Sequence, residues 1–321
     1  MKRKILICGS TGFIGRNIVA SLTERDGFEV FGTCFNSEPL DNPKIKMIRA
    51  DLRRNEEVEN VVKGMDIIIQ AAATTSGAKD TINKPYYHVT DNAVMNSLIF
   101  RAAHEQGVSH VVFFSCTTMY QTSDVPVKET DFDATEEMYP SYFGVAWTKV
   151  YIEKMCEFYS RLGRTKFTAI RHSNIFGPYD KYDLDRSHVF GATVTKVMTA
   201  EDGGSVMVWG AGEEERDLLY ISDLVSFVEL AISKQDSRYE LYNVGYGSSI
   251  SVNDMVKKII ENSGKNLKIE HDLSKPSIKT KLCLDITRAK NHLGWSPEVS
   301  LGEGIQKTMD WYKSHFTQEA R

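Results

Sequence analysis

Three glycines near the start of the chain have the spacing of a phosphate-binding turn. Gly9, Gly12 and Gly15 form a GxxGxxG pattern between a short apolar run and an amphipathic stretch. One glycine permits a tight turn, another lets the backbone approach a pyrophosphate, and the last allows a helix to pack closely on a strand. The N-terminus of that helix supplies free N–H groups and a partial positive charge. The pattern therefore predicts a dinucleotide site, and the alternative is an ordinary glycine-rich turn.

Other reactive patterns receive little support from the sequence. The eight histidines form no HExxH motif and no paired Cys/His spacing, so no metal site is predicted. The chain has no GxSxG nucleophile elbow and nothing that resembles a Walker loop. Chemistry therefore depends on what a bound dinucleotide supplies.

The elements that position the glycine turn alternate between β-rich runs and amphipathic stretches. Continuous apolar runs are typical of strands buried on both faces by crossover helices. We therefore expect an α/β fold, a doubly wound parallel (Rossmann) sheet with a smaller, irregular C-terminal substrate region. The predicted strands are residues 4–8, 29–33, 46–48, 66–69, 111–115 and 167–170, and the predicted helices are 13–24, 55–63, 89–105 and 142–161.

After residue 171 the predicted loops are longer, and strand-like and helix-like segments alternate less regularly. We expect a dinucleotide-binding Rossmann domain over residues 1–171 and a mainly substrate-binding region over 172–321. Residues 240–245 again resemble a core strand and are predicted to return to the Rossmann sheet.

Composition excludes several other classes of protein. The chain has 321 residues, 41% of them hydrophobic, and a net charge of −4, which disfavours a nucleic-acid-binding surface. No apolar run reaches the length of a membrane helix, and glycines after Cys8 interrupt the signal-peptide-like start. Five dispersed cysteines without a CxxC pair indicate free thiols. We expect a cytoplasmic protein with no membrane partner.

The GxxGxxG spacing resembles that of extended short-chain dehydrogenase/reductases of the nucleotide-sugar epimerase/dehydratase group. Asp51-Leu52-Arg53 is similar to the element whose aspartate contacts the adenine amino group, and residues 71–73 to the run beneath the nicotinamide ribose. Asn92 resembles a helix asparagine that stabilises the sheet, and residues 171–178 resemble R-x-x-N-x-Y/F-G-P. The resemblance implies a cofactor site formed by Gly9, Thr11, Gly12, Phe13, Ile14, Gly15, Asn36, Asp51, Leu52, Ala71, Ala72, Ala73, Asn92, Ser115 and Lys149.

The end of the second strand bears on the choice between NAD and NADP. An acid there binds the ribose 2′-hydroxyl, whereas an arginine accepts a 2′-phosphate. The segment Thr33-Cys-Phe-Asn-Ser37 contains neither. Asn36 and Ser37 fit either cofactor, and the missing positive charge favours NAD, with NADP as the alternative.

The catalytic region departs from the family pattern. The resemblance implies a Ser/Thr on the strand, which falls on Cys116 beside Thr117, and a Tyr-x-x-x-Lys whose lysine is Lys149. Val145 stands where the tyrosine is expected, and valine cannot transfer a proton. Tyr142 lies one helical turn earlier and is a candidate replacement. The routes left open for the proton are Tyr142, a water held by Thr117 or Cys116, and His188.

The substrate end resembles that of GDP-sugar enzymes. Arg216 lies in a G-x-G-x-x-x-R-D segment whose arginine commonly contacts a diphosphate, and His188 resembles the histidine of fucose-synthase-type enzymes. Asn174 is the third implied substrate residue. Thr117 and Thr118 replace the Asp-Glu pair of 4,6-dehydratases, and Thr118 also replaces the epimerisation cysteine.

What remains is oxidation, reduction or epimerisation at one carbon of a nucleotide sugar, most plausibly C4. Two long amphipathic helices, 89–105 and 142–161, pair into a homodimer interface in this family. The competing hypothesis is a non-catalytic dinucleotide-binding or scaffold protein, which Val145 supports.

Overall fold

Seven strands form one parallel sheet, and the computed structural model describes residues 2–74, 86–184, 187–275 and 280–316. The strand order is β10-β6-β5-β4-β1-β2-β3, and every neighbouring pair is parallel. This is the doubly wound arrangement predicted from the alternation of runs. The strands are β1 (Arg3–Cys8), β2 (Phe28–Cys34), β3 (Ile45–Arg49), β4 (Ile67–Gln70), β5 (His110–Phe114), β6 (Lys166–His172) and β10 (Tyr239–Val244).

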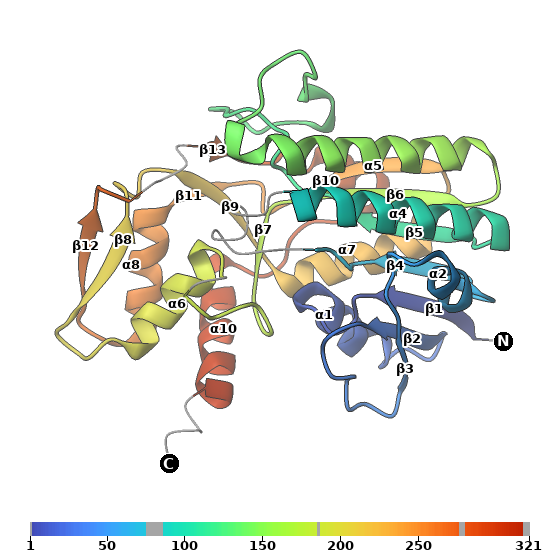
Figure 1. Cartoon of the computed structure of the whole chain (residues 1–321). Helices are drawn as coiled ribbons and strands as arrows, with labels where there is room; N and C mark the ends of the chain where they lie inside the picture. The colour runs from blue at the N-terminus through green and yellow to red at the C-terminus, as the bar shows by residue number, and fades with distance from the viewer. Residues whose placement is uncertain (1, 75–85, 185–186, 276–279, 317–321) are drawn as a thin grey trace.

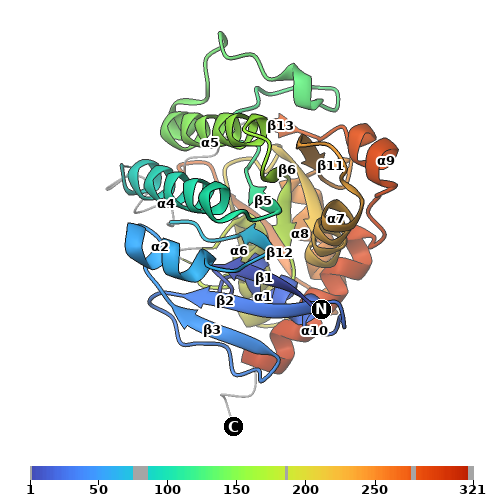
Figure 2. The same cartoon turned by 90° about the vertical axis from the view of Figure 1, so that its right-hand side faces the viewer.

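Helices cover both faces of the sheet (Figures 1 and 2). Alternate strand residues face opposite layers, so Ile5 belongs to the cluster that contains α1 and α7, and Leu6 belongs to the other. This two-sided burial explains the continuous apolar runs. The first layer contains α1 (Phe13–Leu22) and α7 (Ile221–Lys234), and the second contains α2 (Asn55–Val62), α4 (Tyr86–Gln106) and α5 (Phe143–Arg161).

The chain after residue 171 contains more regular structure than its sequence predicted. Strand β9 (Glu215–Tyr220) pairs with three short strands, and β8 (Ser205–Trp209) pairs with β12 (Lys268–Asp272). Strands of two to five residues have too few alternating positions to be recognised from sequence. The remaining elements are β7 (Asn174–Phe176), β11 (Ser249–Ser251), β13 (Lys281–Leu282), α6 (Val189–Thr199), α8 (Val252–Ser263), α9 (Thr287–Leu293) and α10 (Leu301–Phe316).

Strand β10 pairs with β6 at the edge of the large sheet, as predicted for residues 240–245. Helix α5 begins at Phe143, and the two short 3-10 turns before it are η1 (Glu129–Asp131) and η2 (Pro140–Tyr142). Tyr142 therefore lies at the entry to α5 rather than inside it. All the sheet strands are parallel, so β1, β2, β4, β5 and β6 present their carboxyl ends at one edge, where a doubly wound fold binds its ligand.

Candidate functional site

The glycine turn has the close backbone approaches that its spacing predicted. Gly9 has φ +72°, and a Cβ there would lie 2.7 Å from the Cα of Ala72. A Cβ on Gly15 would lie 2.2 Å from the carbonyl oxygen of Gly9. Gly12 caps α1 and has no side chain, so within the described residues the N–H groups of the first helical turn carry no side-chain cap. A turn in which side chains are sterically excluded fits a dinucleotide phosphate.

The other residues predicted around this turn lie close to it. Ala71 and Ala72 follow β4 and contact Gly9, while Phe13 and Ile14 form the first turn of α1 and pack on the core. Thr11 joins the turn to the segment after β2, because its hydroxyl lies 2.7 Å from that of Ser37. Asn36, beside Ser37, and Ala73 are exposed or partly exposed in the described structure.

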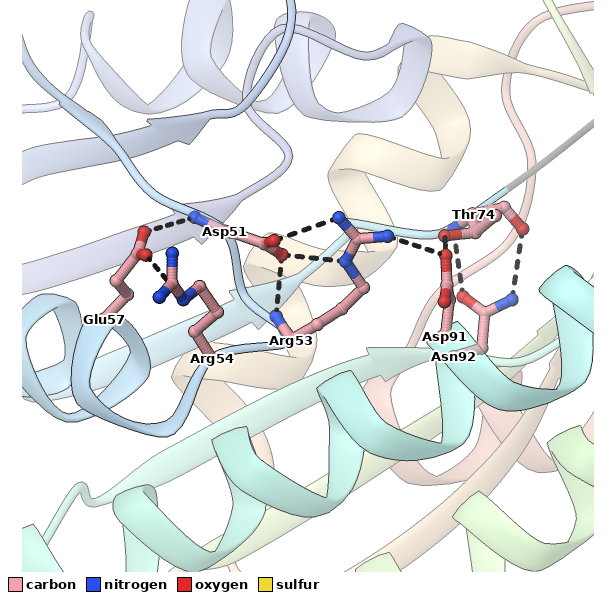
Figure 3. Close-up of polar contacts among 7 residues, drawn as sticks. All are labelled: Asp51, Arg53, Arg54, Glu57, Thr74, Asp91 and Asn92. Atoms are coloured by element: carbon pink, nitrogen blue, oxygen red, sulfur yellow. Dashed lines mark hydrogen bonds and ion pairs between the residues drawn. The ribbon is translucent and has the colours of Figure 1, made fainter.

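Asp51, predicted to contact adenine, is held by a neighbouring arginine (Figure 3). Arg53 donates to both carboxylate oxygens of Asp51, at 2.8 and 2.9 Å, and to Asp91 at 3.0 Å. The Arg53 guanidinium holds the pKa of Asp51 below its usual range, so the carboxylate is an acceptor at neutral pH. Leu52 is buried in the core, so only its backbone is available to a cofactor.

Asn92 fastens the segment after β4 to helix α4. Its amide accepts the N–H of Thr74 at 3.0 Å and donates to the Thr74 carbonyl at 3.1 Å (Figure 3). The same amide donates to the His88 carbonyl at 2.7 Å. Asn92 therefore holds Thr74, the residue that directly follows the alanine run, against helix α4.

Lys149 lies beside the carboxyl end of β5. Its ammonium donates to the Phe114 carbonyl at 2.7 Å and lies 4.8 Å from the ring centroid of Phe113. Burial lowers the pKa of this lysine, and the fields of Cys116 and Glu153 oppose that shift. A desolvated ammonium at the sheet edge can bind a ribose hydroxyl and favour an adjacent oxyanion.

The Ser115 hydroxyl is hydrogen-bonded to a buried ion pair that the sequence analysis did not predict. Its hydroxyl donates to Glu153 at 2.5 Å, and Arg171 donates to the same carboxylate at 2.7 and 3.0 Å. The Glu153 and Arg171 side chains are each 4% exposed. The predicted cofactor contact of Ser115 thus competes with this pair. Glu153 follows Lys149 by one helical turn, which was the available signal.

Tyr142 lies in the electrostatic field of two other predicted site residues. Burial raises its pKa, the Arg216 guanidinium opposes that rise, and Cys116 adds to it. The pKa of Arg216 is shifted as well: burial lowers it, and the neighbouring Tyr142 phenol opposes that shift. Cys116 lies 2.9 Å from the Thr118 hydroxyl, and Thr117 accepts a backbone hydrogen bond from residue 120. The fold therefore brings Cys116, Tyr142 and Arg216 within electrostatic reach of one another.

The remaining substrate candidates flank the same edge. Asn174 is exposed and donates to the Asp217 carbonyl at 3.3 Å. His188 directly precedes α6, and surrounding protein atoms lower its pKa. Sequence reasoning missed His172 at the end of β6, whose pKa burial lowers to about 4, with Lys149 and His188 contributing. The only sequence signal for His172 was its place between Arg171 and the predicted substrate residue Asn174.

Arg216 is tied to strand β9 and to the segment before β13. It donates to the Glu215 carbonyl and to the carbonyl and hydroxyl of Thr280, at 2.7–2.9 Å. All three bonds come from Nη1, so they tie the guanidinium to β9 and to Thr280.

Comparison with known proteins agrees with this geometry. The sequence profile of the NAD dependent epimerase/dehydratase family matches residues 5–245, so the chain belongs to that family. It is 28% identical to a GDP-L-fucose synthase of Azorhizobium caulinodans, covering 97% of this chain and 96% of that protein. A GDP-L-colitose synthase of Yersinia pseudotuberculosis is also 28% identical, over 96% and 97% of the two chains.

Among solved structures, a UDP-glucose 4-epimerase from Thermotoga maritima, determined with UDP-glucose, superposes with a TM-score of 0.85. It is 25% identical, and the match covers 97% of this chain and 99% of that one. The likeness therefore extends through the substrate region as well as the Rossmann sheet.

Proposed function

We propose that this protein is a nucleotide-sugar oxidoreductase that acts with NAD at a single sugar carbon, C4. It is a 4-dehydrogenase, 4-reductase or 4-epimerase, and a GDP-linked sugar is the first candidate because GDP-sugar synthases are among its relatives. The observation that carries the proposal is Lys149, a desolvated ammonium that shares the carboxyl edge of the sheet with Cys116. Relatives matched over nearly the whole chain support the same class.

The chain's own residues divide the work between the two ends of the site. The glycine turn and the N-terminus of α1 hold the pyrophosphate, and Asp51 accepts from the adenine. Lys149 orients the nicotinamide ribose, and Arg216 holds the substrate diphosphate. The bound cofactor supplies the hydride acceptor and donor.

The proton of the reacting hydroxyl needs a group other than the missing tyrosine. We propose Tyr142, because it lies at the entry to α5, one turn before the position expected for the tyrosine. Burial raises the pKa of its phenol, and the Arg216 guanidinium offsets part of that rise. Positioning and the fixed charge of Lys149 contribute further to lowering the barrier. The alternative proton acceptors are His188 and a water held by Thr117 or Cys116. If one of them takes the proton, activity will survive the Tyr142→Phe substitution.

A non-catalytic role is not favoured. The chain keeps the residues implied for the substrate end, His188 and Arg216, and a protein that only binds dinucleotides has no need of them. The two relatives named above are synthases, and the match covers 96% and 97% of their lengths.

The proposed assembly is a homodimer through α4 and α5. These helices pack side by side, and their outer faces expose Val94, Tyr151 and Phe158, which are 40–56% exposed (Figure 2). Apolar side chains on adjacent helices form a self-complementary face suited to a two-fold axis. Tyr151→Glu is expected to give monomers in light scattering, and a wild-type monomer at micromolar concentration would contradict the assembly.

The proposed location is the cytoplasm, because all five cysteines are free. Within the described ranges, no helix has both the length and the apolar character needed to span a bilayer.

A panel of GDP-, UDP- and dTDP-linked hexoses and their 4-keto forms tests the proposed function, with nicotinamide absorbance for oxidation or reduction and separation of the product sugars for epimerisation. Lys149→Met is expected to abolish turnover. Lys154→Met is the matched control, because its side chain lies on the same helix and is 73% exposed. Equal activity in both variants, or no activity of wild type with any sugar nucleotide, would contradict the proposal.

A further inference from the structure

The imidazole of His172 is held in one tautomer by the backbone beside it. His172 is the last residue of β6, and its Nδ1 lies 2.8 Å from the carbonyl oxygen of Ser173. A carbonyl oxygen can only accept a hydrogen bond, so Nδ1 carries the proton. In a neutral imidazole that is protonated at Nδ1, the lone pair lies on Nε2. The Nε2 atom of His172 is therefore a hydrogen-bond acceptor.

The surroundings of His172 keep this imidazole neutral. Burial lowers the pKa of His172 to about 4, the hydrogen bond to Ser173 opposes the shift, and Lys149 and His188 add to it. Lys149 belongs to the predicted cofactor site and His188 to the predicted substrate site. The ring therefore lies near both, and its Nε2 remains an acceptor at neutral pH.

His172 shares a face of the chain with Asn174, an implied substrate residue. Residues 172–174 run from the end of β6 into β7, and alternate side chains of an extended chain point to the same side. The burial pattern agrees, because Ser173 is buried, whereas His172 is half-buried and Asn174 is exposed. Within the part of the chain that the structure describes, no group donates a hydrogen bond to Nε2. A desolvated acceptor without a protein donor favours a ligand that supplies one.

We propose that His172 is a substrate-binding residue whose Nε2 accepts a hydrogen bond from the sugar hydroxyl next to the reacting carbon, the 3-hydroxyl of a nucleotide-linked hexose. Lys149 marks the end of the site where the hydride moves, and His172 lies near it on the side of Asn174. A fixed acceptor rejects a sugar that lacks the hydroxyl, because the desolvated Nε2 is then left unpaired. The inference rests on the proposed function and narrows its substrates to hexoses with a free 3-hydroxyl.

Nitrogen NMR on the full-length protein with isotope-labelled histidine tests the tautomer directly. Bare and protonated ring nitrogens resonate far apart, and the loss of signals in His172→Gln identifies those of His172. We expect a protonated Nδ1 and a bare Nε2 that do not change between about pH 6 and 8, because the pKa of His172 is lowered to about 4. The protein is loaded with NADH, which cannot oxidise a sugar hydroxyl. GDP-mannose should then shift the Nε2 signal, and GDP-3-deoxymannose should leave it in place.

Calorimetry on the NADH-loaded protein measures the strength of the contact. Wild type should bind GDP-mannose about 10- to 100-fold more tightly than GDP-3-deoxymannose. His172→Phe keeps a ring beside Phe114 without an acceptor, so it should bind the two compounds within about twofold of each other. His172→Gln, whose amide oxygen can accept, should recover part of the preference. The matched control is His104→Phe, which replaces a half-buried histidine that packs on Tyr159 in the last turn of α4, and it should keep the wild-type preference.

Three results would overturn the inference. A protonated Nε2, or an imidazolium at neutral pH, removes the acceptor. Equal affinity of wild type for the two compounds removes the 3-hydroxyl contact. A preference for GDP-mannose that survives in His172→Phe, with both compounds weakened equally or not at all, shows that the ring only supports the site. Failure of wild type to bind either compound contradicts the GDP-sugar substrate of the proposed function, and the inference falls with it.

Discussion

Replacing Glu153 by glutamine removes the negative half of the ion pair beneath Lys149 and keeps the side-chain shape. Arg171 would then be a guanidinium that is 4% exposed without its countercharge, while the new amide nitrogen faces donors on Arg171 and Ser115. Breaking a buried pair in this way costs about 3–5 kcal/mol of unfolding free energy. The pair lies one helical turn from Lys149, so the nucleotide-binding edge should loosen with it.

Urea denaturation of Glu153→Gln and Glu157→Gln measures this cost. Glu157 lies on the same helix, pairs with Lys154 and Arg161 near the surface, and should lose only about 0–1 kcal/mol. Replacing Glu153 and Arg171 together by methionine should recover most of the loss, because neither charge of the pair is then left buried without its partner. If Glu153→Gln costs no more than Glu157→Gln, the reasoning about the buried pair is wrong.

Further predictions concern the site itself. Tyr142→Phe should lower kcat about 10²- to 10⁴-fold if the phenol is the proton acceptor, whereas a small change would assign that role to water or His188. Arg216→Met should raise the pKa of Tyr142, because a cation that favours the phenolate is lost, and the alkaline shift of the pH–rate profile would show it. Lys149→Met should increase stability below the lysine's folded pKa, since the folded state disfavours the cation; the gain in urea midpoint should shrink as the pH rises through that pKa. Gly15→Ala should abolish AMP binding in calorimetry, whereas Gly27→Ala, where a Cβ meets nothing within 4 Å, should leave it unchanged.

The fold followed from the sequence because both faces of the sheet are covered. Every β-rich run predicted in the first 171 residues became a strand, with ends that differ by one or two residues. Strand β10 was recognised for a similar reason, since Leu241, Tyr242 and Val244 lie between more polar segments. The short strands of the substrate region gave no such signal, because they pair over only two to five residues.

The sequence predicted the part of the site that one contiguous segment forms. It did not predict the contacts between segments that are far apart in the chain. The glycine turn is local, and its steric pattern agrees with its spacing. Arg171 reaches Glu153 only through the packing of α5 on β6. The resemblance placed Ser115 in the cofactor site, and its buried partner Glu153 lies 38 residues away in the sequence. Sequence distance hides contacts of this kind.

Isotope transfer tests the central claim, redox chemistry at C4, most directly. The protein is incubated with NAD and a nucleotide-linked hexose that carries deuterium at C4, and the products are analysed by mass spectrometry. The account predicts deuterium in the reduced cofactor, or retained at C4 of an inverted sugar if the protein is an epimerase. Release of the deuterium into water, or an unlabelled reduced cofactor with the deuterium still at an uninverted C4, would contradict it.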